Sequence, residues 1–194
     1  MGLSHRDGLR DWLRAPGSLS RRLARLGSRF EVQVLSQRVA PLRAAERQTL
    51  GLPKRGLTVV REVVLRVDGV ALVWARSALH QSALSGPWKA VRGLGARPLA
   101  HLLYDDPRIS RSELQPRRLA RFGHTRRHMQ RQWLQATGEA ASAQMLWSRH
   151  SVFSRCGAQL RVMELFAPEL VGTAPQHGKV RGRIKTPRVR VCPP

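Results

Sequence analysis

The chain has 194 residues, of which 42% are hydrophobic, so it is long enough to form one domain with its own core and too short for two. Lys and Arg number 35 against 12 Asp and Glu, which gives a formal net charge of +23 and predicts an anionic partner. Nucleic acid, an anionic membrane surface and a small polycarboxylate all fit that description. The N-terminal sequence lacks the apolar core of a secretory signal, and no window approaches the ~20 apolar residues of a membrane span. We therefore expect a cytoplasmic protein.

The first elements in chain order are two short helices and a strand. Residues 10–26 are rich in helix formers but are broken by Ala-Pro-Gly at 15–17, after which Ser18 can cap the second helix. Residues 30–34 alternate apolar and polar side chains, which is the period of a strand. The polar stretch at 35–55 indicates a loop and a short helix.

Two pairs of β-rich runs give the strongest strand signals. Residues 58–67 and 70–78 are joined by Asp-Gly, a frequent hairpin turn, and residues 146–155 and 158–166 are joined by Cys-Gly. These runs predict antiparallel hairpins. The fold class is therefore α+β, with an antiparallel sheet and helices on one side of it.

The rest of the chain has weaker signals. Residues 84–106 predict a turn, a short helix and a second helix that begins near Pro98. Residues 107–144 are rich in Arg and in helix formers, with two interrupting glycines. We expect one domain over residues 1–170 and a basic, disordered tail over residues 171–194, where Gly and Pro accompany Lys and Arg without any acid.

The cysteine and histidine patterns give no support for a metal site. Cys156 and Cys192 lie far apart without a CxxC pair, and the seven histidines show no HExxH pattern. We therefore expect two free thiols, no metal and no cofactor.

Two strand runs each carry one charge among apolar residues. Because side chains alternate along a strand, Arg61 shares its face of residues 58–67 with Val and Leu only, and Glu164 shares its face of residues 158–166 with Ala, Leu, Val and Phe. A buried, unpaired charge is costly, so each group needs a partner. Either the two pair with each other, or both face water because the face assignment is inverted, or both bind a ligand. In the last case Arg61 would hold a carboxylate, and Glu164 would accept a hydrogen bond from a hydroxyl or move a proton.

Seven short motifs resemble, in order and spacing, the landmarks of bacterial chorismate lyases, from about residue 10 to residue 168. They are WLRAPGSLSRRL (12–23), VREVVL (60–65), ARSAL (75–79), LSGPW (84–88), LGARPLAHLL (94–103), WSRHSVF (147–153) and VMELFAP (162–168). The resemblance implies a roughly six-stranded, mainly antiparallel sheet with flanking helices and helical flaps over a buried ligand. It also implies cleavage of chorismate into 4-hydroxybenzoate and pyruvate, the first committed step of ubiquinone biosynthesis, without a cofactor.

The resemblance assigns roles to five residues. Arg61 matches the family's arginine that holds the ring carboxylate, and Glu164 matches its glutamate that faces the ring hydroxyl, so these two are the expected catalytic residues. Leu19 and Leu99 match substrate-binding positions whose backbone N–H groups face the ligand carboxylate. Arg76 matches a further arginine near the site, where it would steer the substrate. A closed pocket for such a product further predicts strong product inhibition.

Two other functions compete with this interpretation. Six arginines between residues 117 and 131, together with the tail, are compatible with a nucleic-acid-binding module, but only 5% of the residues are aromatic and no stacking motif lies among the arginines. A ligand-sensing domain of the same fold usually follows a helix-turn-helix segment, and only a few residues precede Trp12. We expect a monomer with chorismate as its substrate and no specific nucleic-acid partner. The tail is either a weak contact to anionic lipid or a solvated extension.

Overall fold

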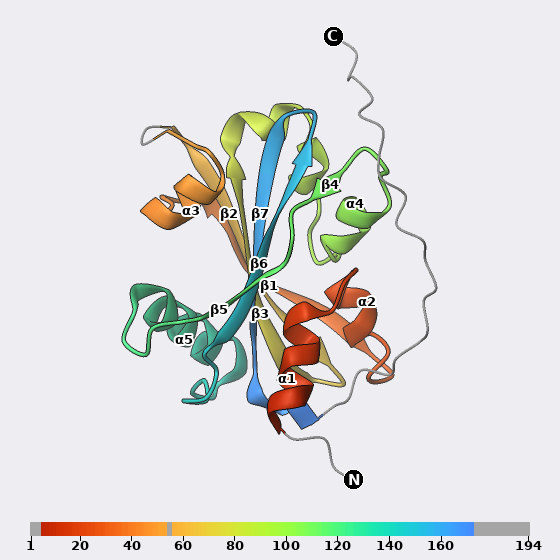
Figure 1. Cartoon of the computed structure of the whole chain (residues 1–194), viewed down its shortest axis with the longest axis vertical. Helices are drawn as coiled ribbons and strands as arrows, with labels where there is room; N and C mark the ends of the chain where they lie inside the picture. The colour runs from red at the N-terminus through yellow and green to blue at the C-terminus, as the bar shows by residue number, and fades with distance from the viewer. Residues whose placement is uncertain (1–4, 54–55, 173–194) are drawn as a thin grey trace.

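The computed structural model describes residues 5–53 and 56–172, and its centre is one seven-stranded sheet (Figure 1). The strand order is β1-β2-β3-β7-β6-β4, with β5 also paired to β6, and every paired strand runs antiparallel. The strands are β1 (Phe30–Val39), β2 (Thr58–Val67), β3 (Val70–His80), β4 (Ser110–Arg111), β5 (Gln115–Arg118), β6 (Trp147–Arg155) and β7 (Ala158–Phe166). The α+β class is confirmed, with one strand more than the resemblance implied.

Helices cover both faces of the sheet, so the prediction of helices on one side is wrong (Figure 1). On one face lie α1 (His5–Arg14), α2 (Leu19–Leu23) and α4 (Ala100–Tyr104), and on the other lie α3 (Ala44–Thr49) and α5 (His124–Thr137). Short 3-10 helices complete the described chain: η1 (Gln81–Ser85), η2 (Lys89–Val91) and η3 (Pro168–Gly172). Helices lie on both faces because nine of the ten residues of β2 are buried, so that both faces of this strand need a cover.

Each face has its own core. Trp12 and Leu23 of the first two helices pack with Val63 of β2, whereas Met129 of α5 packs with Val64, the next residue of the same strand. The alternation of side chains along β2 therefore decides which core each residue joins. None of the described helices has the length and the apolar character needed to cross a membrane.

Both predicted hairpins are confirmed. Asp68 and Gly69 have φ values of 48° and 82°, and Cys156 and Gly157 have φ values of 47° and 75°. Two successive residues with positive φ form the turn that matches the twist of the flanking strands, which is why glycine takes the second position in both. Cys156 is disulfide-bonded. The expectation of a free thiol at this position is therefore wrong.

Among the other elements, those with a clear sequence signal are confirmed and those with a weak signal were not predicted. The first two helices are confirmed, and the Ser18 hydroxyl accepts a hydrogen bond from Arg21 N at 3.2 Å. The strands β4 and β5 were not predicted, because all four residues of β5 are exposed and show no alternation of burial. The two glycines of residues 107–144 flank α5: Gly123 directly precedes it, and Gly138, with φ of 76°, ends it. Residues 173–194 of the predicted tail, Cys192 among them, lie outside the described residues.

A buried network of charges joins α3, α5 and the sheet on the face of Glu62. Arg76 donates hydrogen bonds to Glu46 Oε1 at 2.9 Å and to Glu62 Oε1 at 2.5 Å, and His128 Nε2 lies 2.8 Å from the same Glu62 oxygen. Burial opposes ionisation of Glu62, but the hydrogen bonds from His128 and Arg76 outweigh it and lower the pKa of Glu62 to about 2. Burial likewise opposes ionisation of Glu46, whose pKa is nevertheless lowered by its hydrogen bonds with Arg76 and Arg43.

This network predicts a loss of stability in acid. A carboxylate whose pKa is lower in the folded than in the unfolded state stabilises the fold above its unfolded pKa, and the stabilisation is lost as the pH falls toward the folded pKa. For Glu62 the window runs from 4.5 down to about 2, and its contribution is about 3 kcal/mol. Glu62→Gln should therefore unfold more easily than the wild type at neutral pH, and the difference should shrink within this window. Urea unfolding measures both, with the exposed Glu113→Gln as the control. A difference independent of pH would contradict the prediction.

Candidate active site

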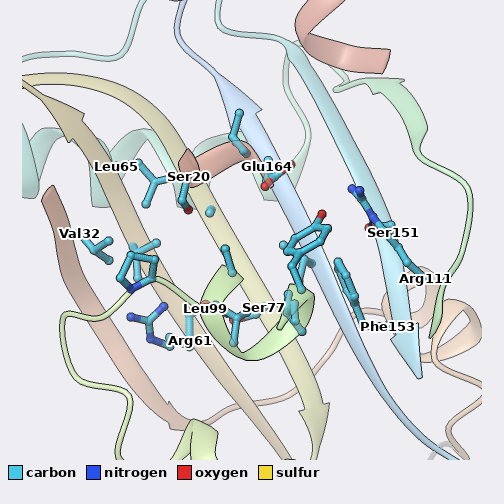
Figure 2. Close-up of a pocket in the computed structure, with 18 residues that line it drawn as sticks. Ser20, Val32, Arg61, Leu65, Ser77, Leu99, Arg111, Ser151, Phe153 and Glu164 are labelled. Atoms are coloured by element: carbon cyan, nitrogen blue, oxygen red, sulfur yellow. Dashed lines mark hydrogen bonds between the residues drawn. The ribbon is translucent and has the colours of Figure 1, made fainter. Parts of the chain in front are cut away.

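A cavity lies between the sheet and the segments that carry α2 and α4 (Figure 2). The empty space of the cavity, together with the open solvent at its mouth, is about 610 Å³. Its floor comes from β1, β2, β3, β6 and β7, and its cover comes from α2, α4 and the turn before α4. Most of the lining is apolar. The charged and hydroxyl-bearing residues of the lining are Ser20, Arg61, Ser77, Tyr104, Arg111, Ser151 and Glu164.

Arg61 enters the cavity from β2 without a carboxylate partner among the described residues. Its side chain is buried, with 3% of the residue exposed. Nη2 donates to the carbonyl oxygens of Gly95 at 2.8 Å and Arg97 at 3.4 Å, whereas Nε is buried without any partner in residues 5–53 and 56–172. Burial lowers the pKa of Arg61. Gly95, with φ of 53°, permits the turn that presents these carbonyl groups. The guanidinium is therefore oriented by the backbone and still has donors for an anion.

Glu164 enters the cavity from β7 and has its own partner. Arg149 on β6 lies opposite it in the ladder and donates from Nε to Glu164 Oε2 at 2.5 Å. Arg149 Nη1 also donates to the carbonyl oxygens of Trp12 at 2.8 Å and Ala15 at 2.9 Å, at the end of α1. The hypothesis that Arg61 and Glu164 pair with each other is thus wrong, and so is the one that both face water.

The register of the strands sets the distance between the two charges. Arg61 pairs with Ser77 of β3, and Glu164 pairs with Ala75 of the same strand. Two strand spacings and an offset of two residues place their Cα atoms about 12 Å apart. Both side chains face the same cavity, with Arg61 at one end and Glu164 at the other (Figure 2). The strand β3 thus lies between the strands that carry the two charges.

The cover carries both leucines that the sequence comparison singled out. Leu19 is the first residue of α2 and follows the capping Ser18, and Leu99 directly precedes α4. Both line the cavity. The first N–H groups of a helix have no acceptor within it, so these positions can donate to a ligand.

Arg76 is the one predicted site residue that the structure does not bring to the cavity. Its neighbours Ala75 and Ser77 line the cavity, so alternation along β3 turns Arg76 to the opposite face. There it is held by Glu46 and Glu62. The alternation of side chains along β3 alone predicts this placement, whereas the assignment of Arg76 to the site followed the family resemblance.

Three residues of the site region escaped the sequence analysis: Tyr104, Arg111 and Arg149. Arg149 lies in a strand of mixed polarity, Ser-Arg-His-Ser, where no residue stands out against its face. Arg111 belongs to a two-residue strand, which is too short to show a period. Alternation along the chain identifies a charge on an apolar face, but it cannot identify a partner on another strand.

The fold and the cavity together define an α+β protein with a cavity between its sheet and a helical cover, lined mostly by apolar residues and by Arg61, Arg111 and Glu164. The profile of the chorismate lyase family matches residues 4–174. The chain is 47% identical over 162 residues to a probable chorismate pyruvate-lyase of Albidiferax ferrireducens, covering 84% of this chain and 82% of that one. It is 41% identical over 167 residues to a protein of the same description from Azoarcus sp., with coverages of 84% and 86%. The chain belongs to the chorismate lyase family.

A solved structure, the PhnF C-terminal domain, shares the fold. Its TM-score is 0.52 at 16% identity, and the superposition covers 78% of this chain and 87% of that one. At this identity the likeness extends to the fold alone.

Proposed function

We propose that the chain is a chorismate lyase, which releases pyruvate from chorismate and leaves 4-hydroxybenzoate. The observation that carries this proposal is that a buried arginine without a carboxylate partner among the described residues, Arg61, lines the same cavity as Glu164 in a chain of this family. Chorismate has a ring carboxylate at one end and a ring hydroxyl at the other. The two side chains match these groups in charge and in hydrogen-bonding character.

The reaction needs positioning more than chemical activation. The bond between the ring and the ether oxygen breaks, the hydrogen on the hydroxyl-bearing carbon moves to the enolpyruvyl methylene, and the ring becomes aromatic. Aromatisation supplies the driving force, and a cyclic transfer of this hydrogen requires no protein base. The chain's contribution is to hold the ring and the ether in a reactive arrangement and to exclude water.

Each named residue takes one part in this arrangement. Nε and Nη1 of Arg61 bind the ring carboxylate, with the backbone N–H groups of Leu19 and Leu99 as further donors. Glu164 accepts a hydrogen bond from the ring hydroxyl through Oε1, because Oε2 is occupied by Arg149. Val63, Phe153 and other apolar residues of the lining enclose the ring.

One assay tests the proposal directly. Purified protein is incubated with chorismate, and 4-hydroxybenzoate and pyruvate are each measured over time. We expect the two products in equal amounts, at rates that fall in Arg61→Ala and Glu164→Ala. If the wild-type protein forms neither product, the proposal is wrong.

We also propose that the chain acts as a monomer in the cytoplasm. One chain supplies the floor and the cover of the cavity, so a second copy is not needed to complete the site. Light scattering across a concentration series, together with activity per chain, tests this. Activity that rises with concentration per chain would show that assembly is required.

The cover of the cavity is tied down by two contacts that should limit product release. The Tyr104 hydroxyl of α4 donates to Gly17 O at 2.7 Å, and Arg21 Nη2 of α2 lies 2.5 Å from Asp105 Oδ1. One hydrogen bond and one exposed ion pair together contribute about 1–2 kcal/mol. We expect Tyr104→Phe combined with Asp105→Asn to weaken inhibition by 4-hydroxybenzoate by roughly tenfold. Turnover at saturating substrate should rise if release limits it.

Steady-state kinetics with added 4-hydroxybenzoate measure this effect. Glu31→Gln is the matched control, since it removes an exposed ion pair with Arg29 that lies away from the cover. Unchanged product inhibition in the double variant would contradict a role for these contacts in release.

A further inference from the structure

Arg111 is a second arginine of the cavity without a carboxylate partner among the described residues. It lies on β4, and its Nε donates to the Ser151 hydroxyl at 3.0 Å, while Nη1 lies 3.4 Å from Gly17 O. Its guanidinium carbon lies over the Phe153 ring at 5.2 Å and over the Tyr104 ring at 5.7 Å. Burial lowers the pKa of Arg111, with smaller contributions from nearby charges. The rings and Ser151 thus fix the direction of this cation.

The charges around the cavity do not cancel. Arg149 and Glu164 form a pair, which leaves Arg61 and Arg111 as two cations that line the cavity without a counter-ion in residues 5–53 and 56–172. A buried cation without a counter-ion is unfavourable, so this arrangement favours a ligand with two negative charges. A ligand with a single carboxylate would compensate only one of them.

The connectivity of chorismate places its second carboxylate at the Glu164 end of the cavity. The ring carboxylate lies opposite the ring hydroxyl, and the enolpyruvyl ether is attached to the carbon next to the one that carries the hydroxyl. If Arg61 binds the ring carboxylate and Glu164 faces the hydroxyl, the enolpyruvyl carboxylate must lie beside Glu164 and away from Arg61. Figure 2 shows Arg111 and Ser151 on the Glu164 side of the cavity, with Arg61 at the opposite end.

We infer that Arg111 binds the enolpyruvyl carboxylate of chorismate, an inference that rests on the proposed function. The Ser151 hydroxyl accepts from Nε and Gly17 O accepts from Nη1, so the two hydrogens of Nη2 and the second hydrogen of Nη1 remain for the ligand. The two arginines then recognise the two carboxylates of one molecule. After the ether bond breaks, pyruvate stays with Arg111 and 4-hydroxybenzoate with Arg61, so that Arg111 contributes to substrate binding and not to retention of the aromatic product.

A pair of stable ligands isolates this contact from turnover. The first is 3-(carboxymethoxy)-4-hydroxybenzoate, which carries a charged tail next to the hydroxyl, and the second is 4-hydroxy-3-isobutoxybenzoate, whose tail has a similar shape without charge. In calorimetric titrations the wild type should prefer the charged tail by roughly 100-fold. Arg111→Met should remove this preference. Arg61→Met should lower the affinity for both ligands and leave the preference for the charged tail unchanged.

Kinetics give a second readout. Arg111→Met should raise KM for chorismate by roughly 100-fold, while the inhibition constant of 4-hydroxybenzoate changes by less than about threefold. Arg108→Met is the matched control, because it removes an arginine three residues away that is bound to Asp106 outside the cavity. Arg111→Lys keeps the charge and should keep part of the preference, and thermal unfolding of each variant reports whether it is folded.

The outcomes separate the inference from the proposed function. An Arg111→Met variant that binds the charged and neutral tails in the wild-type ratio would overturn the inference. The inference would also be overturned if Arg111→Met lowered the affinity for 4-hydroxybenzoate by as large a factor as the affinity for 3-(carboxymethoxy)-4-hydroxybenzoate. If the wild-type protein prefers the charged tail but does not convert chorismate, the binding role of Arg111 stands and the proposed lyase activity is wrong.

Discussion

Replacing Arg61 by methionine should lower kcat/KM for chorismate by roughly 10³-fold, because removing one partner of a buried charge pair costs about 4 kcal/mol. The same change should leave the unfolding free energy of the ligand-free protein unchanged or raise it. The reason is that Arg61 is buried without a carboxylate and has an unpartnered Nε among the described residues. A cation that is unfavourable in the empty site and favourable in the complex serves binding at the expense of stability.

Two measurements on the same variant distinguish a binding arginine from a structural one. Steady-state kinetics give kcat/KM, and urea unfolding without ligand gives the free energy of unfolding. Arg92→Met is the control, since it removes an exposed arginine of the neighbouring turn whose side chain donates a hydrogen bond to the Ser85 hydroxyl. If Arg61→Met unfolds several kcal/mol more easily than the wild type, Arg61 supports the fold through Gly95 and Arg97, and its assignment to the substrate fails.

The sequence contained enough information to find both hairpins and the two charges on apolar faces. Strand runs with a turn of suitable residues specify their own register, so residues 58–67 and 158–166 could each be placed with a face toward the core. Arg61 and Glu164 then stood out as exceptions on those faces. Both line the cavity, and their separation across β3 follows from the ladder.

What the sequence could not provide is the order in which strands neighbour one another. β7 pairs with β3 as well as with β6, and only this order brings Glu164 into the cavity that contains Arg61. Arg149 becomes the partner of Glu164 for the same reason. Arg111 comes from a short edge strand whose only local signal is its polarity, so the sequence alone could not identify it as the second cation of the cavity.

The covering of both faces could have been anticipated from β2. Its sequence, TVVREVVLRV, places Val on both parities of the strand, which is typical of a strand buried on both sides. The prediction of helices on one side rested on the antiparallel hairpins and did not use this pattern. Glu62, on the other parity, is 2% exposed and paired with Arg76, so it marks the second core as clearly as Arg61 marks the cavity.

Arg149→Met should produce the largest loss of stability among these variants, about 3–5 kcal/mol. The residue is 1% exposed and joins three elements, because it donates to Glu164 on β7 and to the carbonyl oxygens of Trp12 and Ala15 at the end of α1. Its removal leaves a carboxylate without its cation and helix-end carbonyl groups without a donor. Activity should fall as well, since Glu164 loses the contact that orients it.

A double-mutant cycle separates these contributions. Combining Arg149→Met with Glu164→Gln should recover at least about 1 kcal/mol relative to the sum of the two single variants, because a neutral amide costs less to leave unpaired than a carboxylate. The part that is not recovered belongs to the carbonyl groups of α1. Arg155→Met, on the same strand but partly exposed and paired with Asp106, should cost about 1 kcal/mol or less. If urea unfolding finds Arg149→Met no more destabilised than Arg155→Met, Arg149 does not hold the floor and the first helix together, and the orientation of Glu164 must have another cause.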